Sequence, residues 1–166
     1  MSDPIAYFIT FRTYGTWLHG DERGSTDRDH NAYDTPLLDP HADRLRSARL
    51  RLAQPPVTLS KSARDAVAMV IRQVCDHHHW TLHSSNVRSN HVHVVVSAPR
   101  MPEQVMIALK SWCTRRLRQL GLARKDAKVW SRHGSTKYIW KPKQLTEACR
   151  YVEDAQDDDD RANRTT

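Results

Sequence analysis

The sequence contains no hydrophobic stretch that approaches the length needed to cross a bilayer, and its start, Met1-Ser2-Asp3-Pro4, carries no signal-peptide pattern. We therefore expect a cytoplasmic protein without a membrane partner. Cysteine is also scarce: Cys75, Cys113 and Cys149 are odd in number and widely spaced, which argues against a disulfide framework or a zinc-ribbon site. No internal repeat is visible. The 166 residues are enough for one domain with a substantial core.

Acidic residues are few outside the C-terminus. The whole chain carries a net charge of +7, but Glu153, Asp154 and the run Asp157 to Asp160 are concentrated at its end. Residues 1–152 hold 24 Lys and Arg against 13 Asp and Glu, a net charge of +11. A charge of this size on a small domain favours a polyanionic partner, above all nucleic acid, although a soluble basic protein without such a partner also accounts for it. The like-charge run predicts a disordered acidic tail over 157–166.

The segment Asn90-His91-Val92-His93-Val94-Val95-Val96 is the most informative in the chain. Its valines favour a strand, and alternate strand residues share a face, so His91 and His93 would project together with Cβ atoms roughly 7 Å apart. Two imidazoles at that spacing can converge on one metal ion. Val92, Val94 and Val96 would then face a core. An ordinary strand with two partly exposed histidines explains the spacing equally well.

Hydrophobic periodicity predicts an α+β fold. We expect strands over 5–13, 80–88 and 90–96, and a fourth near 128–132 that residues 136–140 extend or flank. Helices are expected over 40–53 and 102–120. A further helix should run from a cap at Ser60 or Ser62 to about His78, and a last one should begin at Pro142. Residues 21–36 are expected to form a long surface loop. His77-His78-His79 is interpreted as a helix end rather than a metal tract, since consecutive residues splay around a helix.

Apart from the helix over 40–53, this order is the β-α-β-β-α-β pattern of a ferredoxin-like antiparallel sheet, with two helices on one face and an additional C-terminal helix. That last helix could lie against the other face and carry Tyr151 towards His91 and His93. Taken alone, the pattern favours Tyr151 as an ordinary half-buried helix residue. Tyr138 is a rival tyrosine in a strand-like setting, where it could be a core or a stacking residue.

Basic side chains accompany several of these elements. The helix over 102–120 has a basic side that could contact phosphates or simply face solvent. Residues 128–140 interleave basic and aromatic side chains, a pattern that suits single-stranded nucleic acid, although Trp130 or Trp140 could also be core residues. The residues assigned to DNA contacts are Arg12, Lys110, Arg115, Arg116, Arg132 and Lys137.

Together these segments resemble a known family. Asn90 to Val95 is similar to the histidine-hydrophobe-histidine (HUH) motif of single-strand DNA endonucleases. Residues 7–12, 129–134 and 148–152 resemble the single-tyrosine transposases of insertion sequences, most of all the REP-associated tyrosine transposases. The resemblance covers roughly residues 5–156, so we expect one catalytic domain over 1–156.

The resemblance implies a function and a mechanism. His91 and His93 would hold a divalent metal, Mg²⁺ or Mn²⁺, on a phosphate of single-stranded or hairpin DNA. Tyr151 would attack that phosphate and form a 5′-phosphotyrosine link, which the 3′ hydroxyl of a second strand can reverse. Relatives of this type act as monomers or as homodimers with shared sites.

One position departs from the family pattern. Members carry Asn or Gln four residues after the tyrosine as a third metal ligand, and here that position is Ala155. Gln156 and Asp154 are the neighbouring candidates, of which Asp154 shares the side of Tyr151 better and Gln156 needs the helix to distort or end. The alternative function is therefore a catalytically inactive, domesticated nucleic-acid-binding module.

Overall fold

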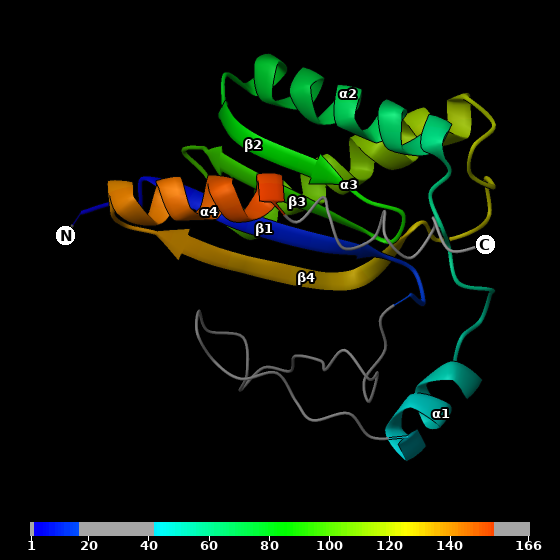
Figure 1. Ribbon diagram of the computed structural model, residues 1–166. Helices are drawn as coiled ribbons and strands as arrows, with labels where there is room; N and C mark the ends of the chain where they lie inside the picture. Colours follow the sequence, from blue (N-terminus) through cyan, green and yellow to red (C-terminus); the bar gives the residue numbers. More distant parts are fainter. Residues whose placement is uncertain (1, 17–41, 155–166) are drawn as a thin grey trace.

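A four-stranded antiparallel sheet forms the centre of the protein in a computed structural model, which describes residues 2–16 and 42–154. The elements follow the chain as β1 (Ala6–Thr13), α1 (Ala42–Leu50), α2 (Lys61–His78), β2 (Thr81–Val87), β3 (His91–Ser97), α3 (Pro102–Gln119), β4 (Trp130–Ile139) and α4 (Pro142–Asp154). The strand order is β2-β3-β1-β4. Figure 1 shows α2 and α3 together on one face of the sheet and α4 on the other.

The predicted ferredoxin-like fold is confirmed. Residues 136–140 extend the fourth strand rather than flank it, so that β4 is a single strand. Ser60, not Ser62, caps α2: its hydroxyl accepts the backbone N–H of Ala63 at 3.2 Å. The predicted loop over 21–36 and the acidic tail over 157–166 lie outside the described residues, as does Gln156.

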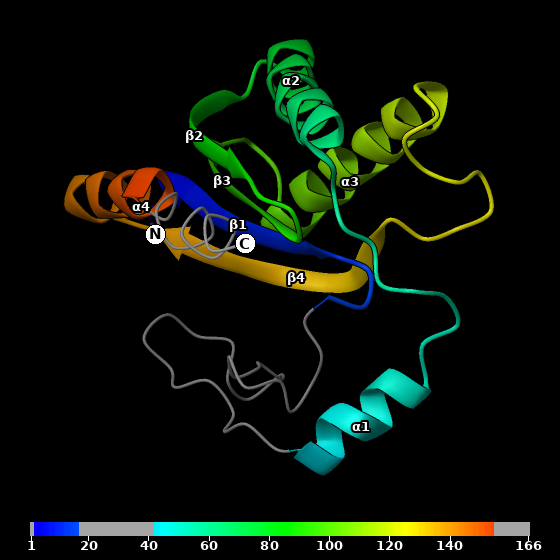
Figure 2. The same cartoon turned by 45° about the vertical axis from the view of Figure 1, so that its right-hand side comes forward.

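The main core lies between the sheet and the pair α2 and α3. Figure 2 shows both helices on the same side of the strands. Val92, Val94 and Val96 of β3 are fully buried there against apolar residues of both helices, as the alternation in the sequence predicted. The same core holds Trp130, whose indole N–H donates to the carbonyl of Lys110 at 3.2 Å. Since alternate residues of β3 serve this core, the remaining residues of the strand face α4.

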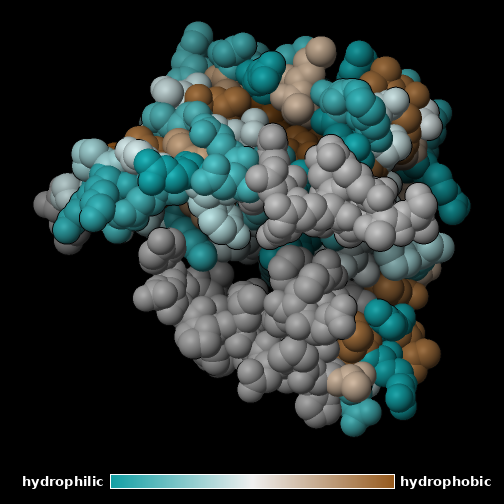
Figure 3. Space-filling model, in the orientation of Figure 1, coloured by the Kyte–Doolittle hydropathy of each residue, from teal (hydrophilic) through white to brown (hydrophobic). Residues whose placement is uncertain are grey.

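A second, smaller core lies under α4. Val152 is the fully buried anchor of this helix, and it packs with Ala6, Val95 and Ile139 from the sheet. The outward side of α4 is hydrophilic (Figure 3), as expected for an amphipathic helix at the surface. The buried side chain of Asn86 in β2 also donates a hydrogen bond to the carbonyl of Val152 at 3.0 Å. Apolar packing and this bond together fix where α4 lies on the sheet.

The histidine run at the end of α2 forms a helix terminus, as predicted. His79 adopts the left-handed conformation that ends the helix, with φ of 57°, and its N–H bonds back to the last turn. His78 stacks on Trp80 with ring centroids 4.4 Å apart. These contacts give the run a structural role. Within the described residues no helix is both long and apolar enough to cross a membrane.

Gly134 of β4 occupies a position where a side chain would clash. A Cβ atom there would lie 2.5 Å from the carbonyl oxygen of Thr10 and 2.6 Å from the sulfur of Met106. Because the first of these is a backbone atom, β1 and β4 would have to move apart locally around a larger residue.

Gly134→Ala should therefore lower the free energy of unfolding by about 1–3 kcal/mol, measured by chemical denaturation. Ser135→Ala is the matched control, because Ser135 pairs with Thr10 and so lies on the other face of β4. Equal stability of the two variants would show that the close approach is not a constraint.

Candidate active site

Two histidines of β3 stand side by side on the face that α4 covers. Their ring centroids are 4.7 Å apart, and they pair across the sheet with Arg12 and Thr10 of β1. His93 is buried and His91 is half-buried. The structure therefore gives the pair the shared face that strand alternation predicted.

Each imidazole is oriented by a hydrogen bond at Nδ1. The Nδ1 atom of His91 lies 2.7 Å from the side-chain oxygen of Asn90, which can only accept, so Nδ1 carries the proton. The Nδ1 atom of His93 lies 2.8 Å from the hydroxyl of Thr10, a buried residue. In His91 the other nitrogen, Nε2, is then the one suited to a metal ion, whereas the hydroxyl of Thr10 can donate to Nδ1 of His93 or accept from it. Polar partners of this kind fix the tautomer and orientation of metal-binding histidines.

Burial lowers the pKa of His93 to about 3, and the positive charges of His91, Arg12, Arg88 and Lys137 act in the same direction. At neutral pH the imidazole is therefore uncharged. A neutral imidazole is the form that binds metal ions.

Tyr151 lies next to this pair. Its ring centroid is 5.9 Å from that of His93 and 6.0 Å from that of Phe8, which itself stacks on His93 at 5.4 Å. The side chain is 59% exposed, so the phenol borders the histidines and is also open to solvent. The neighbouring residue, Val152, carries both the apolar anchor and the hydrogen bond that hold α4 in place.

The donor set around the pair is two imidazoles. Asp154 lies exposed at the end of α4, and across residues 2–16 and 42–154 no cluster of three or more His, Cys, Asp or Glu side chains could hold a metal ion. The structure thus does not bring Asp154 into such a cluster with His91 and His93. Two nitrogen donors fit a divalent ion whose other positions are filled by oxygen atoms, an arrangement that suits Mn²⁺ better than Mg²⁺.

Of the basic residues predicted to contact DNA, Arg12 and Lys137 lie near the histidines. Arg12 pairs with His91, Lys137 pairs with Phe8, and both charges act on His93. Arg88 belongs with them, because its backbone N–H bonds to the carbonyl of His91 at 2.8 Å and its charge also acts on His93. Sequence reasoning missed Arg88, although its place opposite His91 across the turn at 89–90 was a usable signal.

The predicted contacts on α3 lie on the opposite face of the sheet from the histidines. Lys110 of α3 donates to the carbonyls of Ser131 and His133 at 2.9 and 3.1 Å, and burial lowers its pKa to about 8. The guanidinium of Arg115 lies over the ring of Trp112. Arg116 is exposed on the same helix and Arg132 is exposed on β4. The structure does not bring the stripe on α3 together with the histidine pair.

Tyr138, the rival tyrosine, is also remote from the histidines. It pairs with Tyr7, a residue of the main core, and so belongs to the opposite face of the sheet. Its ring stacks with that of Trp140 at 5.9 Å, and both side chains are partly exposed.

Lowering the pH should destabilise the fold through His93. The folded state keeps this side chain neutral down to a pKa of about 3, whereas the unfolded chain protonates it near 6.5. The unfolded state therefore binds more protons between these values, and the free energy of unfolding falls with falling pH by up to about 1.4 kcal/mol per unit.

His93→Gln should flatten this dependence, measured by chemical denaturation at a series of pH values between the two. His133→Gln, at an exposed position of β4, controls for the loss of a histidine. If the free energy of unfolding of His93→Gln fell with pH as steeply as that of the parent protein, the role given to His93 would be contradicted.

Comparisons with known proteins agree with this fold. The sequence model of the family "Transposase IS200 like" matches residues 56–155. A crystal structure of a candidate transposase from Deinococcus radiodurans R1 is similar, with a TM-score of 0.51 and 12% identity, over 93% of this chain and 92% of that one. A REP-associated tyrosine transposase bound to a REP hairpin matches with a TM-score of 0.48 and 11% identity, over 91% of this chain and 66% of that one. No curated protein sequence matches.

The family match covers α2, β2, β3, α3, β4 and α4, and so includes the histidine pair and Tyr151. The resemblance to insertion-sequence transposases seen in the sequence is thereby confirmed. The chain belongs to the IS200-like transposase family.

Proposed function

We propose that this transposase cleaves and rejoins single-stranded DNA by transesterification, with Tyr151 as the nucleophile and His91 and His93 as ligands of a divalent metal ion. The observation that carries the proposal is the position of the Tyr151 ring, 5.9 Å from that of His93 in the same chain. A tyrosine and a metal-binding imidazole pair on one face of a sheet are the parts that this reaction needs.

The reaction balances without an external energy source. Tyr151 loses its phenolic proton, its oxygen forms a bond to phosphorus, and the bond from phosphorus to the 3′ oxygen breaks, with that oxygen taking up a proton. One phosphodiester is thus exchanged for a 5′-phosphotyrosine, and the 3′ hydroxyl of another strand reverses the exchange with the phenolate as leaving group. The bound ion would withdraw charge from the phosphate oxygens and orient them.

The side chains around the pair suit this substrate. Arg12, Arg88 and Lys137 place positive charge beside His93, where a DNA phosphate would lie. Asn90 keeps His91 in the tautomer that presents Nε2, and the hydroxyl of Thr10 orients the ring of His93 through its hydrogen bond to Nδ1. The sequence resemblance to REP-associated transposases adds hairpin-tailed strands as the substrates to test first.

Tyr151→Phe should abolish formation of a covalent protein–DNA product, because the phenolic oxygen is the atom that attacks. The measurement is a denaturing gel after incubation of labelled hairpin-tailed single strands with protein and Mn²⁺. Tyr138→Phe is the matched control and should form the product as the parent does. A product that survives Tyr151→Phe, or is lost only in Tyr138→Phe, would reject the assignment.

Mn²⁺ should bind the parent protein, and His91→Ala should eliminate that binding. Thr10→Val removes the hydroxyl at Nδ1 of His93 but keeps the shape of the side chain, and it should weaken Mn²⁺ affinity about 10–100-fold. Titration calorimetry measures both effects without DNA. Parental affinity in both variants would place the metal elsewhere.

A second function is favoured by one observation. Ala155 stands where the family carries a ligand, and the described residues supply no cluster of three His, Cys, Asp or Glu ligands. A nucleic-acid-binding module without chemistry would bind DNA with a steep dependence on salt and would be indifferent to His91→Ala. Metal-dependent formation of the covalent product excludes this alternative.

A further inference from the structure

A groove of about 850 Å³ opens at the end of the sheet where β1 ends and β3 begins. We call it the end groove. Its walls come from the residues after β1, from α1, from the segment that links α1 to α2, and from the turn before β3. The lining residues used below are Thr16, Arg49, Pro55, Pro56, Thr58 and Asn90.

The end groove and the histidine pair share a residue. Asn90 lines the groove, and its side-chain oxygen accepts the hydrogen bond from Nδ1 of His91. Its backbone carbonyl accepts from the N–H of Thr13 at 2.9 Å and from the hydroxyl of Thr16 at 3.3 Å. Consecutive Cα atoms are about 3.8 Å apart, so the groove begins one residue away from the proposed metal ligands.

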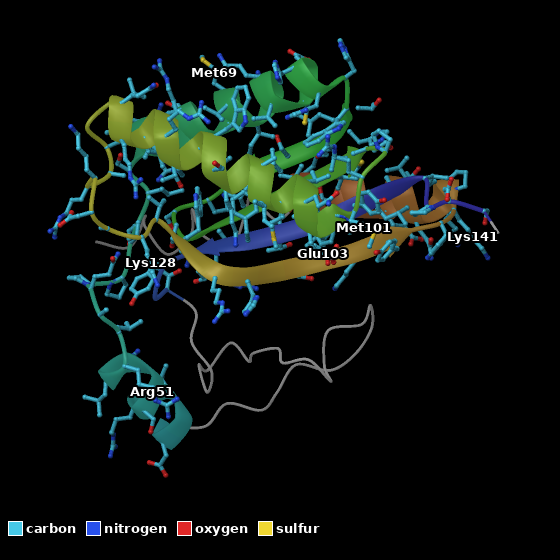
Figure 4. The ribbon with its side chains drawn as sticks, turned by 180° about the vertical axis from the view of Figure 1, so that it is seen from behind. Arg51, Met69, Met101, Glu103, Lys128 and Lys141 are labelled. Carbon is cyan, nitrogen blue, oxygen red and sulfur yellow. The ribbon has the colours of Figure 1, made fainter. Side chains whose placement is uncertain are left out.

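Hydrogen bonds hold the walls of the groove. Gln54 pairs with the backbone of Lys128 in both directions, at 2.7 and 2.9 Å, and Figure 4 shows Lys128 where the chain passes this end of the sheet. The N–H of Leu59 donates to the carbonyl of Ser89 at 2.7 Å. Gly15 has a φ of +73°, and a Cβ there would lie 3.2 Å from Cα of Pro56. The linking segment, which forms one wall of the groove, is thus held against the sheet.

The lining offers the chemistry of a nucleotide site. Pro55 and Pro56 supply apolar surface against which a base can stack, and Thr16 and Thr58 supply hydroxyls for its polar edge. Arg49 brings a positive charge for a phosphate. Arg12 and Arg88 add positive charge beside His93, where the phosphate of the same strand would lie.

From these contacts we infer that the end groove is a subsite for an unpaired nucleobase of the single strand whose phosphate lies at His91 and His93. The inference rests on the proposed function. It adds a specificity element, because a base held beside the reacting phosphate selects where along a strand the phosphate comes to rest. Asn90 is a positioning residue that belongs to both sites.

Substitutions that fill the groove with a large side chain test the inference without metal or cleavage. Every protein in this experiment carries Tyr151→Phe, so that no strand is cleaved. Fluorescence anisotropy measures the Kd for a thymidine 12-mer and for an abasic 12-mer of the same charge. We expect the abasic strand to bind about tenfold more weakly, because it has no base to place in the groove. Thr58→Trp should remove this difference, and Met69→Trp, at an exposed position of α2 far from the groove, should keep it.

Ala53→Trp fills the same groove from another wall position and should repeat the result if Thr58→Trp folds poorly. Arg49→Gln should weaken both strands equally, because it removes a phosphate contact. The inference is overturned if either filled variant that keeps the parental melting temperature retains the same ratio of Kd values as Met69→Trp. The covalent product is scored separately in the parent protein, which keeps Tyr151. Its absence there refutes the proposed function even when the ratio of Kd values collapses, and its presence with an unchanged ratio refutes only the subsite.

Discussion

The site depends on how α4 is held against the sheet. Val152 is buried with Ala6, Val95 and Ile139, and the amide of Asn86 donates to its carbonyl. Burying a valine side chain contributes about 1.5–3 kcal/mol, and a buried hydrogen bond adds about 1 kcal/mol. These are modest energies, but they act on the residue next to Tyr151. A shift of α4 by one residue along its axis would move the phenol about 1.5 Å and turn it away from His93.

The surroundings of His93 combine a cost to stability with a gain for function. Burial and the charges of Arg12, Arg88 and Lys137 depress the pKa of His93, so keeping this imidazole neutral costs stability as the pH falls. Under the proposed function, the same condition would keep the nitrogen available to a metal ion, and the same cations would attract DNA phosphates. Clustered positive charge near a buried histidine is thus explained by the proposed chemistry, whereas folding alone gives no reason for it.

Much of this arrangement could be predicted from local patterns. Alternation in β3 separated His91 and His93 from the valines of the core, and helical periodicity placed Tyr151 at the edge of an apolar stripe.

What could not be predicted depends on contacts between distant parts of the chain. Nothing near Thr10 indicates a bond to His93, and nothing near Asn86 indicates that it ties down α4. Lys110 fell within an exposed basic stripe by periodicity, yet its long side chain reaches the carbonyls of β4. The sequence left open whether residues 136–140 extend or flank the fourth strand, and it did not indicate that Gly134 lets β1 and Met106 approach.

The central claim is that α4 presents Tyr151 to a metal ion held by His91 and His93. Paramagnetic broadening by Mn²⁺ in nuclear magnetic resonance spectra of the ring-labelled protein tests it most directly, because the effect depends on the distance between the ion and each tyrosine ring. The account predicts that substoichiometric Mn²⁺ removes the signals of Tyr151 before those of Tyr138, and that His91→Ala abolishes the effect. Sharp Tyr151 signals at an Mn²⁺ concentration that broadens both histidines would contradict it.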